Sequence, residues 1–82
     1  MAANPVSWYA IEPGWSVTSR DGGAIGTVAS VLGDEDLDIF HGLVCSFWVG
    51  KRQVPAELVT TIEAGKIELG ITDRDVARLA PS

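Results

Sequence analysis

The clearest structural signal in the sequence is a stretch near the start of the chain: Gly14-Trp15-Ser16-Val17, then Asp21-Gly22-Gly23, then Ile25-Gly26-Thr27-Val28. The first part has strand composition, and the aspartate and glycines after it tolerate the positive φ of a chain reversal. The last part opens the returning strand. Its apolar alternation breaks beside Gly26, and a glycine at such a break is typical of a β-bulge. The stretch therefore predicts a bulged β-hairpin.

Turn and strand signals alternate along the rest of the chain. Strands are expected at about Trp15–Ser19, Ala24–Leu32, Asp38–Trp48, Arg52–Val54, Val59–Glu63 and Ile67–Ile71, the third of them bent near Gly42. Turns are expected at Gly33–Asp36, Gly50–Lys51 and Ala64–Lys66, and a helical turn at Pro55–Leu58. Thr72 is expected to cap a short helix over Asp73–Leu79.

These elements predict a mostly β fold, a small six-stranded barrel with one short C-terminal helix. Residues 1–13 form an N-terminal arm, and residues 14–82 form the barrel domain. The predicted core consists of Val17, Ile25, Val28, Val31, Val44, Val59, Ile67 and Leu69.

The ordered set of motifs resembles the PRC-barrel family. The matching residues are Gly14–Val17, Asp21-Gly22, Ile25–Val28, Val31, Val54-Pro55, Val59 and Ile67–Leu69. The family includes the cytoplasmic part of the photosynthetic reaction centre H subunit, the C-terminal domain of the ribosome maturation factor RimM, and small free-standing proteins, which this chain resembles most. The resemblance implies a six-stranded barrel that docks in assemblies and carries no catalysis.

Composition limits the function classes. The 82 residues carry a net charge of −5, which argues against nucleic acid as a direct partner because phosphate binding needs a basic stripe. A single cysteine, Cys45, allows no internal disulfide and fits a reducing compartment. No signal peptide is recognised, and the apolar run Leu43–Val49 is too short to span a bilayer. We therefore expect a cytoplasmic protein without a membrane span.

The residues that could carry chemistry form no complete set. Asp34, Asp36 and Asp38 alternate as calcium ligands do, but Ile39 stands where the loop needs glycine and Cys45 where it needs a distal carboxylate. His41 and Cys45 can share a strand face, yet zinc needs further His or Cys ligands. The glycines of residues 22–26 lack the order of a nucleotide-binding loop. We expect no catalytic residue, no metal site and no cofactor.

Aromatic side chains are the remaining signal, because large aromatics are enriched in protein interfaces. The predicted interface residues are Trp8, Tyr9, Ile11, Phe47 and Trp48. The leading hypothesis is a non-enzymatic interaction and assembly module that docks onto a protein partner or onto itself, most simply as a symmetric homodimer. The alternatives are a small-molecule-binding barrel and a ribosome- or RNA-linked assembly factor. The arm could instead fold back onto its own barrel.

Overall fold

The computed structural model of the chain describes residues 8–81. Two short 3-10 turns, η1 and η2, accompany six strands and one α-helix. In chain order the elements are η1 (Trp8–Ala10), β1 (Ser16–Thr18), β2 (Ala24–Asp34), β3 (Ile39–Phe47), β4 (Gly50–Pro55), η2 (Ala56–Leu58), β5 (Val59–Glu63), β6 (Lys66–Leu69) and α1 (Asp73–Val76). The predicted mostly β fold with a short C-terminal helix is confirmed.

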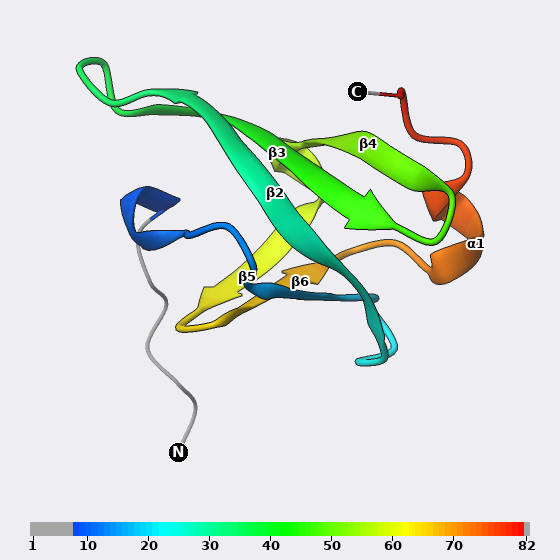
Figure 1. Cartoon of the computed structure of the whole chain (residues 1–82). Coiled ribbons are helices and arrows are strands. Elements are labelled where there is room, and N and C mark those ends of the chain that lie inside the picture. The colour runs from blue at the N-terminus through cyan, green and yellow to red at the C-terminus, as the bar shows by residue number, and fades with distance from the viewer. Residues whose placement is uncertain (1–7, 82) are drawn as a thin grey trace.

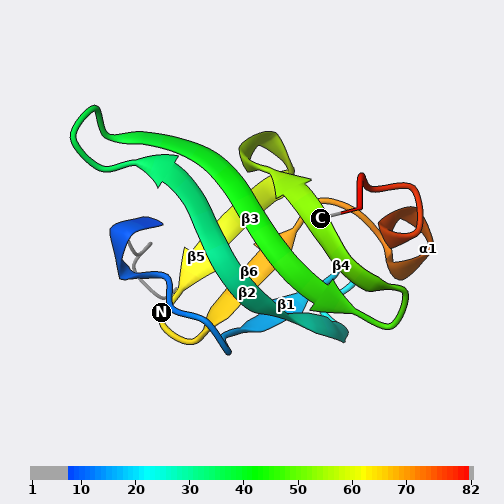
Figure 2. The ribbon, with the colours of Figure 1, turned by 45° about the horizontal axis from the view of Figure 1, so that its top comes forward.

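All six strands belong to one sheet, in the order β4-β3-β2-β1-β6-β5. Neighbouring strands are antiparallel except β1 and β6, which are parallel. The sheet curls into a half-barrel, so that β2 and β3 lie across β5 and β6 in both views (Figures 1 and 2). The β2–β3 hairpin extends beyond the curled part, and α1 lies at the other end, near the β3–β4 turn (Figure 1).

The core lies inside the curled sheet. It is built from Ile11, Val17, Val28, Leu43, Cys45, Phe47, Val54, Ile67, Leu69 and Val76. Five of the eight predicted core residues are buried, and the other three, Ile25, Val31 and Val59, are partly buried and pack against this cluster. The alternation of apolar and polar residues along the strands therefore predicted most of the core correctly.

Gly26 shows why the first hairpin is bulged. The β1–β2 register shifts so that Ile25 is the extra residue, directly beside Gly26. A Cβ on Gly26 would collide with the carbonyl oxygen of Ser46 and lie 2.7 Å from the Phe47 ring. The glycine thus allows β3 to approach β2 closely where the sheet curls.

Several predicted boundaries differ from the structure, among them those of the acidic reversal, the β3–β4 turn and the C-terminal helix. β2 continues through Asp34, so the acidic reversal covers Glu35–Asp38. The β3–β4 turn falls at residues 48–49, because Phe47 already pairs with Gly50 across it. Helix α1 ends at Val76. The backbone hydrogen bonds that follow join residues three apart, so residues 77–79 form turns and not a continuation of the α-helix.

Candidate interaction surfaces

The described part of the arm, residues 8–13, folds back onto the barrel. Ile11 is only 6% exposed and belongs to the core. Trp8 stacks on Phe40 of β3 with ring centroids 5.5 Å apart, and Tyr9 stacks on Trp8 at 4.5 Å. Residues 1–7 of the predicted arm lie outside the described residues. Of the two arrangements left open by the sequence, residues 8–13 adopt the folded-back one.

Gly33 makes this packing possible. A Cβ at Gly33 would lie 2.8 Å from the Trp8 ring and 2.7 Å from the carbonyl oxygen of Ile39. Two hydrogen bonds also join the arm to the hairpin: the Trp8 indole N–H donates to Asp38 Oδ1 at 3.1 Å, and the Tyr9 hydroxyl donates to the Glu35 carbonyl at 3.0 Å. The arm therefore packs against one face of the extended β2–β3 hairpin, which we call its inner face.

The opposite face of the same hairpin stays uncovered within the described residues. Asp34 pairs with Ile39, and the adjacent pair Gly33 and Phe40 faces Trp8, so alternation places Leu32, Asp34 and Ile39 on the outer side. Leu32 is 37% exposed, Ile39 42%, and Leu37 at the hairpin end 67%. Exposed aliphatic side chains gathered at one place are typical of interaction sites.

The hairpin end carries four carboxylates, those of Asp34, Glu35, Asp36 and Asp38, the last of which accepts the Trp8 indole N–H. Asp34 Oδ1 accepts hydrogen bonds from the backbone N–H groups of residues 36 and 37, which fixes the turn. Within residues 8–81 no ion pair joins any of the four to a basic side chain. The pKa of Tyr9 is raised, first by desolvation and then by the nearby negative charges of Asp38, Glu35 and Asp34. We call Leu32, Asp34, Glu35, Asp36, Leu37 and Ile39 the tip surface.

A second exposed site lies at the other end of β3. Trp48, in the β3–β4 turn, is 74% exposed, the largest exposed fraction among the bulky apolar side chains of the described chain. Lys51 is exposed in β4, and the half-buried Arg52 follows it. These are the only two adjacent basic residues in the sequence. Because side chains alternate along β4, Arg52 lies on the same face as the buried Cys45 and Val54, with its Nε buried, whereas Lys51 lies on the opposite face. We call Trp48 and Lys51 the turn surface.

The predicted interface residues therefore lie in different surroundings. Phe47 and Ile11 are buried in the core, Trp8 is half-buried against the hairpin, and Tyr9 and Trp48 are exposed. The structure does not bring the five together. The sequence reasoning missed Leu32, Leu37 and Ile39, although an aliphatic residue inside an acidic turn, as at Leu37, was a detectable signal.

Cys45 and His41, the candidate pair for metal or thiol chemistry, differ in their exposure to solvent. Cys45 is fully buried, and burial raises the pKa of its thiol to about 12, whereas His41 is exposed. His41 is also the extra residue of a bulge between β2 and β3, next to the predicted bend at Gly42. Within residues 8–81 no three His, Cys, Asp or Glu side chains are grouped to hold a metal ion, and no pocket is present in that range.

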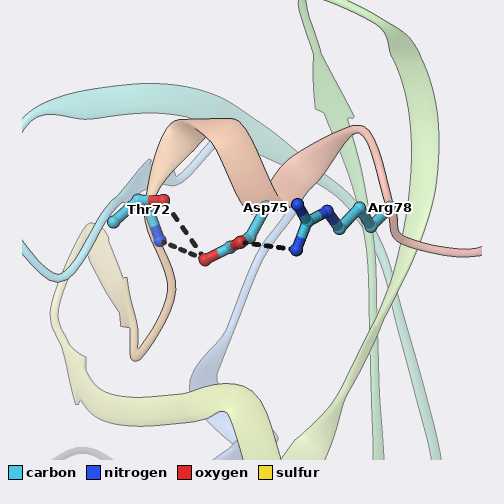
Figure 3. Close-up of polar contacts among 3 residues, drawn as sticks. All are labelled: Thr72, Asp75 and Arg78. Atoms are coloured by element: carbon cyan, nitrogen blue, oxygen red, sulfur yellow. Dashed lines mark hydrogen bonds and ion pairs between the residues drawn. The ribbon is translucent and has the colours of Figure 1, made fainter.

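Helix α1 closes the core at the end opposite the tip surface. Asp75 Oδ2 accepts hydrogen bonds from the backbone N–H and the hydroxyl of Thr72, each at 3.2 Å, and Arg78 lies 3.8 Å from Asp75 Oδ1 (Figure 3). This capping box starts the helix as predicted and directs Val76 into the core. The polar groups of Thr72 and Asp75 therefore stabilise the N-terminus of α1.

Comparisons with known proteins identify no relative: no protein-family model and no curated protein matches the chain. Over residues 8–81, none of the helices has the length and apolar character needed to cross a membrane. We therefore infer function from the exposed surfaces.

Proposed function

We propose that the protein is a non-enzymatic interaction and assembly module, which docks onto another protein or onto a second copy of itself. The observation that carries this proposal is the exposure of Trp48 on a tight turn. Tryptophan is among the residues that contribute most to binding energy in protein interfaces. A rigid turn also presents the indole with little ordering cost.

The resemblance to the PRC-barrel family supports the same function, since members of that family dock in assemblies. The core supports it indirectly: its side chains fill the curled sheet, with Val17, Leu43 and Ile67 each at 0% exposure. Contacts with a macromolecule would therefore form on the outside of the sheet.

Affinity capture with three immobilised proteins tests this function. The wild type is compared with Trp48→Ser, which removes the indole, and with Ala64→Ser, a change at an exposed position in the β5–β6 turn. Native lysate of the source cells is passed over each, and retained proteins are identified by mass spectrometry. We expect the wild type and Ala64→Ser to retain the same protein, either a partner or this chain. Trp48→Ser should retain at least tenfold less of that protein. Equal retention by all three would reject the proposed role of Trp48.

A further inference from the structure

The tip surface and the turn surface lie at opposite ends of β3 and differ in charge. The nine residues of this strand separate them by roughly 25 Å at the rise of a β-strand. The tip combines three exposed aliphatic side chains with carboxylates, and the turn combines an exposed indole with the exposed ammonium group of Lys51. Each surface thus offers apolar area together with one sign of charge.

We infer that these two surfaces bind each other between copies of the chain, the tip surface of one copy against the turn surface of the next. The inference deepens the proposed function and rests on it, since it names the chain itself as the partner. Leu37 and Ile39 would contact Trp48 of the neighbouring copy. Asp36 and Glu35 would lie near its Lys51.

Electrostatics favours this pairing over a symmetric one. A two-fold contact between tip surfaces would bring two groups of three carboxylates together, and none of these is neutralised by an ion pair within residues 8–81. A two-fold contact between turn surfaces would bring the two Lys51 side chains together. Like charges placed together across an interface disfavour it, whereas the tip–turn contact brings opposite charges together.

The tip is also held in place before binding. Trp8 stacks against Phe40 on the inner face of the hairpin, and Tyr9 stacks on Trp8. The Trp8 indole N–H donates to Asp38, and the Tyr9 hydroxyl donates to the Glu35 carbonyl. A surface already ordered in the free protein loses less conformational entropy on association. The arm thereby stiffens the hairpin without occupying its outer face.

Unlike surfaces make a heterologous contact, which leaves one free tip and one free turn on every open assembly. Such a contact closes into a ring or continues as a filament, and does not stop at a dimer unless it closes. The expected assemblies therefore grow with concentration. They should also weaken when NaCl is raised from about 0.1 to 1 M, which shortens the Debye length from about 10 to 3 Å.

Mixing two blocked variants of the full chain tests the inference by sedimentation velocity. Leu37→Glu blocks the tip and Trp48→Glu blocks the turn; both positions are well exposed, so the fold should be kept, and circular dichroism checks this. Ala64→Glu adds the same charge at an exposed turn and serves as the control. The wild type and the control should form salt-sensitive oligomers at about 100 μM, a concentration that detects affinities between micromolar and millimolar.

Each blocked variant alone should sediment as a monomer, while their equimolar mixture should form a species with the mass of two chains. A symmetric contact would behave differently, because one variant would still dimerise and mixing would rescue nothing; that result would overturn the inference. A monomeric wild type would also overturn it. If that monomer still captures another protein through Trp48, the proposed function stands and only self-assembly fails.

Discussion

Side chains of β6 alternate between the core and solvent, and this alternation determines which single residues matter most. Ile67 and Leu69 are both 0% exposed, while Glu68 between them is half-buried and Lys66 is exposed. Ile67 pairs with Val17 of β1 and Leu69 with Val59 of β5, so each lies between strands of the same layer. A deletion of methyl groups there leaves a cavity that the sheet cannot easily close.

Leu69→Ala should lower the free energy of unfolding by about 2–5 kcal/mol, the range measured for buried leucines. Urea unfolding followed by circular dichroism measures the change. Lys66→Ala on the same strand is the matched control and should change stability by about 0.5 kcal/mol or less, as exposed positions do. A change in Leu69→Ala no greater than that of the control would contradict the assignment of Leu69 to the core.

Cys45 should make the protein sensitive to alkali. Its thiol pKa is raised to about 12 by burial, whereas the unfolded chain keeps the ordinary value. The stability contribution of the protonated thiol is therefore complete below the ordinary pKa of 9.0 and falls above it, by about 1.4 kcal/mol at pH 10, since the unfolded state loses its proton first. Cys45→Ala should be less stable than the wild type at pH 7 because the substitution leaves a cavity. Between pH 7 and 10, however, its free energy of unfolding should fall by less than that of the wild type. Parallel pH profiles for the two proteins would contradict this.

The arm packs against the β2–β3 hairpin and adds contacts to those of the hairpin's own ladder. Gly33 lies against the Trp8 ring and the Ile39 carbonyl, and the stack with Phe40 follows from that contact. Aromatic pairs of this kind contribute about 0.5–1.5 kcal/mol beyond their buried area. The hairpin and η1 thus form one packed unit although they are distant in sequence.

Gly33→Ala should displace Trp8 and lower stability by about 1–3 kcal/mol, as overpacking does. Gly23→Ala is the matched control, because its Cβ would meet only the Ser19 hydroxyl at 4.0 Å. Thermal unfolding of both variants measures the difference, and the Trp8 indole N–H resonance should shift in Gly33→Ala alone. Equal melting temperatures for the two variants would show that Trp8 does not lie against Gly33.

Helix α1 depends on the carboxylate of Asp75. Its pKa is lowered, first by the backbone N–H of Thr72 and then by the Thr72 hydroxyl, with Arg78 adding a smaller effect. A lowered pKa means that the contribution to stability is present above the ordinary aspartate pKa and is lost as pH falls through the folded value. Asp75→Asn should therefore be less stable than the wild type at pH 7, and the gap should narrow at pH 3.

Asp73→Asn is the control for this prediction, since it removes the same charge from the same helical turn. Denaturant unfolding of the three proteins at both pH values provides the comparison. If the gap between Asp75→Asn and the wild type is as wide at pH 3 as at pH 7, the effect does not come from the ionised carboxylate.

The curled sheet has two edge strands, β4 and β5, and the C-terminal residues cover part of one of them. The Gln53 N–H donates to the Ala80 carbonyl at 2.8 Å, and Arg52 forms a bridge with Pro81. Open strand edges promote pairing with other chains. This short cover therefore protects β4 beside the turn surface.

A chain that ends at Leu79 should be slightly less stable and should aggregate more readily. The lost backbone bond contributes about 0.5–1.5 kcal/mol, and the exposed edge invites intermolecular pairing. Thermal unfolding and light scattering on heating measure the two effects, with a chain lacking only Ser82 as the control. Identical scattering from both chains would mean that Ala80 and Pro81 do not protect the edge.

Local sequence patterns were sufficient for most of the fold. Period-two alternation located β6, the glycines after Asp21 located the first hairpin, and β5 was predicted at the bounds it has, Val59–Glu63. These features depend on neighbours a few residues away, so the local sequence contains the information. Boundaries shifted where pairing with another strand extended an element, as in β2, which continues through Asp34.

The placement of the aromatic residues required the three-dimensional structure. Sequence alone treated Ile11 and Phe47 as interface candidates, yet both are buried, because the curl of the sheet brings residues 8–13 and β3 to one core. The exposed outer face of the hairpin also follows from long-range contacts, since Trp8 covers the inner face and leaves Leu32 and Ile39 uncovered. Local sequence determines which residues form strands and turns; contacts between distant segments determine which side chains remain exposed for binding.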